Sequence, residues 1–134
     1  MTQEEKDLLL KDLCSRLPYE VKVAFYLYVI DDWKTTTLRS INPSEGTYRI
    51  GNQDYNDLAR IKPYLRPMES MTAEEQKEYE LLANHCIVTS IGFIHLEIRE
   101  IIDWLNAHHF DYRGLIPKSL AIAVTEENNP YKTK

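Results

Sequence analysis

Five aliphatic residues between positions 94 and 105 recur at the spacing of one helical face, and this pattern stops at two adjacent histidines. A helix with one apolar face must bury that face, so the pattern predicts a helix from about Ser90 to about His108. We expect this helix to be the longest in the chain. Gly114 suits the positive φ angle at which a chain reverses after a helix. The aliphatic residues are Ile94, Ile98, Ile101, Ile102 and Leu105.

Two capping boxes predict the starts of two further helices. Thr2 precedes Glu5 by three residues, and Thr72 precedes Glu75 in the same way. In this arrangement each side chain satisfies a free backbone N–H of the first helical turn. The first helix should span residues 2–16. The second should bury a stripe formed by Tyr79, Leu82, Ala83 and Cys86.

Three consecutive strands are predicted over residues 20–50. Residues 20–30 alternate in side-chain direction and are apolar enough on both faces to be central in a sheet. Asp31 and Asp32 indicate a turn after this strand. Because the connections are short, we expect an antiparallel meander. Its strands are residues 20–30, 35–41 and Thr47–Ile50.

The remaining segments give weaker patterns. Residues 54–71 contain two prolines and no clear period, so we expect a connector with one helical turn near residues 55–60. Residues 87–89 fit a short strand or a loop. A final strand is predicted where Leu120, Ile122 and Val124 alternate with small residues.

These elements predict one α+β domain over residues 1–134. We expect a small antiparallel sheet, with an SH3-like half-barrel over residues 20–50 as one form of it, covered by two or three helices. The length of 134 residues is ordinary for a single core. Residues 126–134 are polar and interrupted by proline, so we expect this tail to fray.

The charge balance disfavours polyanionic partners. The chain has sixteen basic and twenty-one acidic residues, a net charge of −5, which opposes nonspecific attachment to nucleic acid or anionic lipid. The sequence has no apolar run of about 18 residues, and its two cysteines, Cys14 and Cys86, fall on apolar helical stripes. We therefore expect a cytoplasmic protein without a membrane span, and its oligomeric state stays open.

The sequence assigns no catalytic, cofactor-binding or metal-binding residue. Its histidines and cysteines lack the spacings of known metal motifs, and no glycine-rich phosphate loop is present. Cys86 beside His85 is favoured as a buried structural cysteine over a nucleophile, because sequence neighbours rarely form such pairs. His108 and His109 are interpreted as residues that favour a helix C-terminus.

Two segments are candidate interaction surfaces. Residues 60–67 interleave aromatic and basic groups as single-strand binders do, although a proline-stiffened connector is the favoured interpretation. Residues 108–114 form either a turn that docks on the core or a recognition loop. The docking turn is favoured for Phe110 and Tyr112. The candidate surface residues are Arg113, Tyr112, His108, His109, Arg66 and Tyr64.

Three segments carry a family resemblance: residues 17–22, residues 61–72, and residues 103–116. Together they resemble a family of small uncharacterised proteins from gut anaerobic bacteria and their mobile or phage-derived elements. Residues 25–56 and 87–101 differ from that family. The resemblance implies no activity, ligand or site residue.

The sequence therefore favours a noncatalytic accessory or protein-interaction protein. One alternative is a nucleic-acid-binding small-barrel protein, which a basic sheet face would favour. The other is a hydrolase that uses histidine and carboxylate groups, which would require these groups to converge in one pocket.

Overall fold

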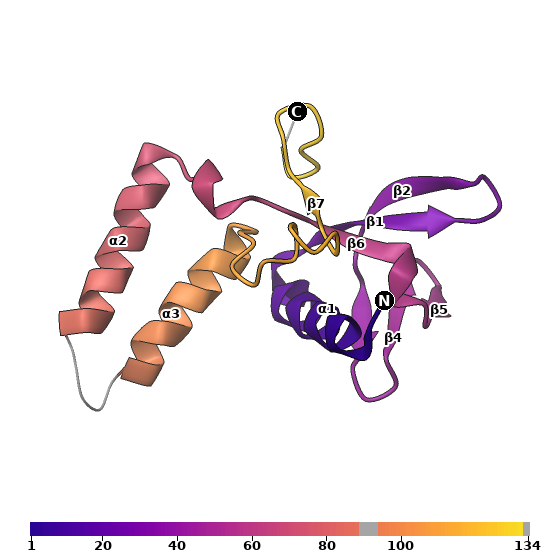
Figure 1. The fold of residues 1–134 in the computed structure, drawn as a ribbon, viewed down its shortest axis with the longest axis horizontal. Coiled ribbons are helices and arrows are strands. Elements are labelled where there is room, and N and C mark those ends of the chain that lie inside the picture. The colour runs from indigo at the N-terminus through magenta and orange to yellow at the C-terminus, as the bar shows by residue number, and fades with distance from the viewer. Residues whose placement is uncertain (89–93, 133–134) are drawn as a thin grey trace.

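The computed structural model describes residues 1–88 and 94–132, and for residues 84–88 and 94–98 it describes the backbone alone. The expectations for the side chains of His85 and Cys86, and for Ser90 as a helix cap, lie outside the described residues. The fold is α+β (Figure 1). Its α-helices are α1 (Gln3–Arg16), α2 (Ala73–Val88) and α3 (Ile94–Ala107), and short 3-10 turns lie at Leu17–Tyr19, Leu58–Arg60 and Met68–Ser70.

Both predicted capping boxes are confirmed. The Thr2 hydroxyl accepts the Glu5 N–H at 3.1 Å, and the Glu5 carboxylate accepts the Thr2 N–H at 2.9 Å. Thr72 and Glu75 exchange the same pair of hydrogen bonds at the start of α2. The first helix ends at Arg16, as expected, where Pro18 enters the following 3-10 turn.

A four-stranded sheet has the order β2-β1-β6-β7. Strand β1 is central, as the sequence predicts, and pairs antiparallel with both neighbours. The predicted final strand is confirmed as β7, which runs parallel to β6 rather than antiparallel. The strands are β1 (Lys22–Leu27), β2 (Asp32–Thr37), β6 (Ile61–Leu65) and β7 (Ile122–Ala123).

Strand β6 lies in the segment expected to be a connector, so that expectation is wrong for residues 61–65. Pro63 is opposite Val23 in β1. Leu38 donates its N–H to the carbonyl of Val21, the residue before β1, so by the antiparallel alternation Val23 directs its own backbone groups to β2. Pro63 therefore needs no N–H towards β1, and a proline is tolerated there.

A separate three-stranded antiparallel sheet has the order β3-β4-β5. The consecutive antiparallel pairings of the predicted meander are confirmed, since residues 35–37 pair with β1 and residues 40–41 pair with β4. The expectation of one sheet is wrong, because these pairings fall in two sheets. The predicted strand 35–41 is divided near Leu38, whose side chain is 3% exposed and turns into the core. The described strands form two sheets and no closed barrel. The second sheet comprises β3 (Ser40–Asn42), β4 (Thr47–Ile50) and β5 (Gln53–Tyr55).

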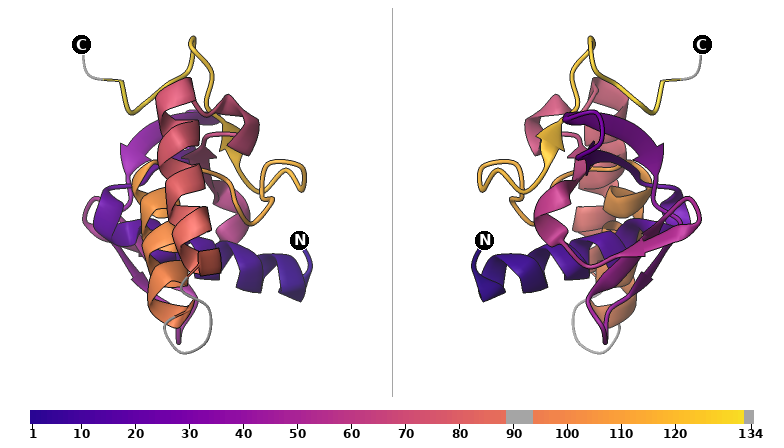
Figure 2. Two further views of the ribbon diagram at one scale, coloured as in Figure 1. Left: turned by 90° about the vertical axis from the view of Figure 1, so that its left-hand side faces the viewer. Right: turned by 90° about the vertical axis from the view of Figure 1, so that its right-hand side faces the viewer.

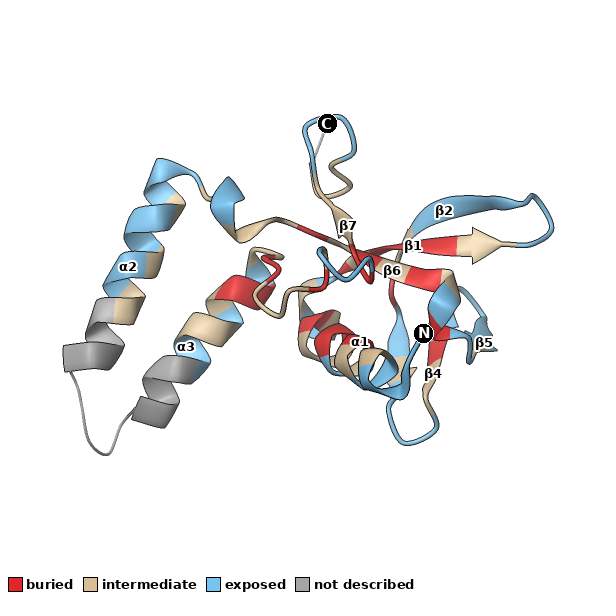
Figure 3. Ribbon diagram, in the orientation of Figure 1, coloured by how far each residue is buried: buried red, intermediate tan, exposed pale blue. Residues whose placement is uncertain are grey.

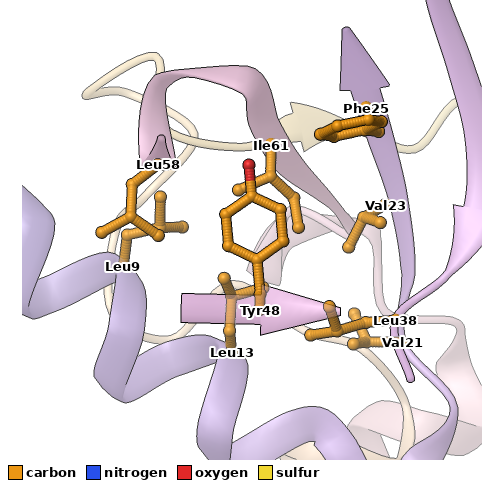
Figure 4. Close-up of a cluster of buried hydrophobic side chains, with 9 residues drawn as sticks. All are labelled: Leu9, Leu13, Val21, Val23, Phe25, Leu38, Tyr48, Leu58 and Ile61. Atoms are coloured by element: carbon orange, nitrogen blue, oxygen red, sulfur yellow. The ribbon is translucent and has the colours of Figure 1, made fainter. Parts of the chain in front are cut away.

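The main hydrophobic core lies between α1 and the two sheets (Figure 4). Phe25 of β1 contacts the rings of Tyr48 and Tyr55, with centroids 6.1 and 4.6 Å away. The Tyr48 hydroxyl donates to the Asp57 carbonyl at 2.5 Å, so this buried ring keeps a hydrogen-bond partner. The core residues are Leu9, Leu13, Val21, Val23, Phe25, Leu38, Tyr48, Leu58 and Ile61.

Helices α2 and α3 lie side by side at the other end of the molecule (Figures 1 and 2). Residues 87–88 belong to α2, so the expected strand or loop there is wrong, and residue 89 is not described. The described part of α3 has 14 residues and that of α2 has 16, and the predicted start of α3 near residue 90 lies outside the described residues. Tyr79, Leu82 and Ala83 are half-buried because α2 is covered mainly by α3 (Figure 3). None of the described helices has the length and apolar content that crossing a bilayer requires.

The C-terminal segment has a side-chain anchor that the sequence interpretation missed. The Tyr131 hydroxyl accepts the Lys22 N–H at 3.0 Å and lies 2.8 Å from the Tyr64 carbonyl, where it can donate. Its ring stacks on His109 with centroids 3.7 Å apart. In the expected frayed tail, residues 126–134, the described part is therefore tied to the ends of β1 and β6 through Tyr131.

Candidate functional site

The segment after α3 docks on the body of the molecule. Phe110 has no exposed area and lies between the Arg66 guanidinium, 4.2 Å from its ring centroid, and the Trp104 ring, 5.7 Å away. The Asp111 carboxylate accepts the N–H groups of Leu115 and Ile116 at 2.8 and 2.9 Å. This geometry matches the docking turn that the sequence favoured over a recognition loop.

A buried ion network joins this turn to α1. Arg16 is fully buried and donates to the Asp12 carboxylate at 2.8 Å and to the Phe110 carbonyl at 2.6 Å. Arg113 donates to the second Asp12 oxygen at 3.0 Å. Both guanidinium groups lie over the Tyr112 ring, with centroid distances of 5.3 and 4.7 Å. The predicted surface residues Arg113 and Tyr112 are therefore engaged inside the fold.

The predicted surface residues His108, His109 and Arg66 lie together around the docked turn, where the Arg66 N–H donates to the His109 carbonyl at 2.7 Å. His108 stacks on Trp104 with centroids 4.2 Å apart. Arg66 makes a bidentate ion pair with Glu75 at 2.7 and 2.6 Å, and this hydrogen bonding lowers the pKa of Glu75 to about 2. Only Tyr64 lies on the exposed side of the sheet. The two imidazoles described do not converge with carboxylates in one pocket, as a hydrolase site would require.

The structure places His109 under the C-terminal segment. Its φ angle is 64°, and its ring is stacked on Tyr131. Burial lowers the pKa of His109 to about 4, and the nearby cations Arg16, His108 and Arg66 act in the same direction. The folded protein therefore holds this imidazole in its neutral form at neutral pH.

His109 should make the fold sensitive to mild acid. Between pH 6.5 and 4 the unfolded chain binds a proton at this imidazole and the folded chain does not. Stability should therefore fall as the pH is lowered through that window, by about 1 to 2 kcal/mol after allowance for partial solvent screening. Urea unfolding of His109→Asn, which tolerates a positive φ, should show a smaller loss. Equal losses in both proteins would refute this prediction.

The exposed side of the four-stranded sheet gathers aromatic and basic groups. We define the outer sheet face by the side chains that alternate away from the core on β1, β2 and β6. Lys22 donates to the Thr37 hydroxyl at 2.5 Å, and the Tyr64 and Thr35 hydroxyls lie 3.1 Å apart. Its charged members, both lysines, give the face a positive character. The face comprises Lys22, Ala24, Tyr26, Trp33, Thr35, Thr37, Lys62 and Tyr64.

An aromatic cluster stands where this face meets the β1–β2 turn. Tyr26 contacts Trp33 and Tyr28 edge-on, with ring centroids 5.4 and 5.2 Å apart, and the Lys62 ammonium lies 5.7 Å from the Trp33 ring. We define the hairpin tip as Tyr28, Val29 and Ile30. These residues are 65%, 96% and 49% exposed. The hairpin projects from the body of the molecule (Figures 1 and 3).

A groove adjoins the opposite end of the outer sheet face. It has a volume of 590 Å³, and its walls are Thr35 and Tyr64 on the sheet and residues 127–130 and 132 of the C-terminal segment. Asn128 fixes the turn in that segment by accepting the Thr125 N–H at 2.6 Å and donating to the Ala123 carbonyl at 3.2 Å. One wall of the groove is therefore the sheet, and the other is a turn that the Asn128 side chain holds in place.

In the described part of the chain, no group of three or more histidine, cysteine or acidic side chains is arranged to hold a metal ion. No protein family model, curated protein or solved structure matches the chain. The resemblance to the family from gut anaerobes stays an expectation. The candidate site therefore rests on geometry and exposure, and among its residues the sequence pointed to Tyr64 and, through the candidate segment 60–67, to Lys62.

Proposed function

We propose that this chain is a noncatalytic interaction protein that binds a partner protein through the hairpin tip and the outer sheet face. The proposal rests on the positions of the exposed apolar side chains. Six large hydrophobic side chains are exposed among the described residues, and four of them, Tyr28, Val29, Ile30 and Trp33, lie in one hairpin. Clustered exposed apolar groups of this kind mark interaction sites.

The aromatic cluster has the properties of a binding anchor. Tyrosine and tryptophan are enriched among the residues that dominate protein interfaces. Trp33 is 38% exposed and is held in place by Tyr26 and by the Lys62 ammonium. Because this ring is already ordered by its neighbours, little conformational entropy is lost when a partner covers it.

A single-stranded nucleic acid is the second candidate partner. Lys22 and Lys62, together with the exposed rings, resemble the combination that stacks and neutralises such strands. The net charge of −5 opposes it, as do Asp31 and Asp32 at the turn. We expect no saturable oligonucleotide binding at about 150 mM salt. Saturable binding under those conditions would favour this second function.

The proposed function is tested by capture from host extract with tagged protein. The parent should capture a partner in a saturable manner. The double variant Tyr28→Ser/Val29→Ser should bind that partner at least about tenfold more weakly, equivalent to about 1.4 kcal/mol of binding energy. Its stability should change by less than about 1.5 kcal/mol, because Val29 is exposed and Tyr28 gives up only its contacts with Tyr26 and with the Arg60 guanidinium, 4.4 Å from its ring centroid.

Leu81→Ser is the matched control for the capture experiment. Leu81 is 70% exposed on α2, at the other end of the molecule, so this variant should capture the partner as well as the parent does. Undiminished capture by the hairpin variant, or an equal loss in the Leu81 control, would refute the proposed contact surface.

A further inference from the structure

Strand β2 forms one edge of the four-stranded sheet. In the order β2-β1-β6-β7 it has a single neighbour among the described strands. Its pairing with β1 is regular over six residue pairs, from Lys22 with Thr37 to Leu27 with Asp32. The opposite side of β2 therefore presents backbone groups that are not used within the sheet.

The pairing identifies which backbone groups these are. Leu38 donates its N–H to the Val21 carbonyl at 3.1 Å, which makes these two residues a hydrogen-bonded pair. Such pairs recur at every second residue of an antiparallel ladder, so residues 32, 34 and 36 bond to β1. Residues 33, 35 and 37 point their backbone groups away from the sheet. The Trp33 N–H is satisfied by the Asp32 carboxylate at 2.8 Å, which leaves the N–H groups of Thr35 and Thr37.

This edge lacks most of the devices that discourage strand addition. Proline, bulges, inward charges and covering loops are the usual protections of an edge strand. Residues 32–37 contain no proline or glycine, and their register with β1 has no bulge. The protection that is present is charge, since Asp32 and Lys34 lie on the core side of the edge, opposite Leu27 and Phe25. Three of the six residues are threonines, which favour extended backbone. The strand is exposed over residues 32–35 (Figure 3).

We propose that β2 receives an extended segment of a partner protein as an added strand. This inference rests on the proposed function, because the added strand would lie beside Trp33 on the outer sheet face. Main-chain hydrogen bonds to Thr35 and Thr37 supply the contact, as in other cases of strand addition.

The side chains along the edge define the chemistry of the added segment. Alternate residues of an added strand lie on opposite faces of the sheet. On the outer sheet face they adjoin Trp33 and Thr35, which suit apolar side chains. On the other face they adjoin Asp32 and Lys34. The Asp32 carboxylate already accepts the Trp33 N–H, so Lys34 is the charge left for a partner side chain. The segment that fits is therefore an alternation of apolar and acidic residues.

A synthetic peptide tests this inference on the intact protein. The probe is an acetylated heptapeptide that alternates valine and glutamate. The control peptide has the same sequence and carries N-methyl groups on the alternate residues that would bond to β2. Binding is followed by NMR titration of the amide signals of residues 32–37. We expect the first peptide to bind with a Kd below about 1 mM and the methylated peptide at least about tenfold more weakly. No shift at about 1 mM, or equal binding of both peptides, would overturn the inference.

Two substitutions at one position separate backbone from side-chain effects. Thr35→Pro removes an N–H that points away from β1, a position where an edge strand tolerates proline, and should weaken binding at least about tenfold. Thr35→Val keeps the N–H and should bind like the parent. If Thr35→Pro does not fold, the methylated peptide on the parent protein decides alone.

The same variants distinguish failure of this inference from failure of the proposed function. Capture from extract that is lost in Tyr28→Ser/Val29→Ser but unchanged in Thr35→Pro would leave the hairpin as the contact surface and exclude strand addition. Unchanged capture in both variants would refute both proposals. Loss in both variants, with Thr35→Val normal, would support strand addition next to the hairpin.

Discussion

Replacing Asp12 with alanine should lower the free energy of unfolding by about 3 to 5 kcal/mol, the cost of leaving a buried charge without its partner. Asp12 has no exposed area and bonds to Arg16 and Arg113 through different oxygens. Arg16 is also fully buried, so it has no access to water when the carboxylate is removed. Chemical denaturation followed by far-UV circular dichroism measures the loss.

Asp7→Ala is the matched control for that experiment. Asp7 lies on the same helix but is exposed, and its carboxylate accepts only a hydrogen bond from Gln3. Its removal should change stability by no more than about 0.5 kcal/mol. If Asp12→Ala behaved like Asp7→Ala, the network between α1 and the turn after α3 would not support the fold.

Phe110→Ala should cost about 3 to 5 kcal/mol, as expected for deletion of a fully buried aromatic ring. The ring lies between Arg66 and Trp104, so its loss leaves a cavity next to a guanidinium group. Phe110→Leu keeps much of the volume and should cost less than about 2 kcal/mol. An unfolding curve for Phe110→Ala that matches the parent's would show that residues 108–114 are a recognition loop and not part of the core.

Helix starts and the central strand were predictable because their causes are local. A capping box needs only a threonine and a glutamate three residues apart, and both boxes are formed in the structure. The position of β4 was predicted for the same reason, since turn residues flank it on both sides. Its pairing with residues 40–41 was predicted as well, but the division into two sheets was not, because it depends on where Leu38 leaves the first sheet.

The exposed hairpin could not be recognised from alternation alone. Residues 20–30 are apolar on both faces, and this pattern indicated burial throughout. The structure pairs β6 only with Val23, Ala24 and Phe25 of β1, so Tyr26 and Leu27 have β2 as their one described sheet neighbour and residues 28–31 form a turn outside the sheet. Apolar residues that a central strand would bury are therefore exposed at residues 28–30.

Residues 108–114 were a candidate interaction surface because aromatic, cationic and imidazole side chains are concentrated there. Their partners come from α1, about a hundred positions earlier in the chain, and such a distant pairing is not visible from local spacing. One signal was available, since Asp12 and Arg16 are spaced i, i+4 on the apolar side of α1. A buried ion pair at these positions indicated that a segment from elsewhere in the fold packs against this side of α1.

Amide hydrogen exchange of the protein with and without its captured partner tests the proposed contact surface most directly. We predict slower exchange on binding over residues 26–37, which contain the hairpin tip and strand β2. Exchange over residues 108–114 should not change, because their backbone and side-chain groups are already engaged inside the fold. Slowed exchange over residues 108–114 with no change over residues 26–37 would contradict the proposed contact surface.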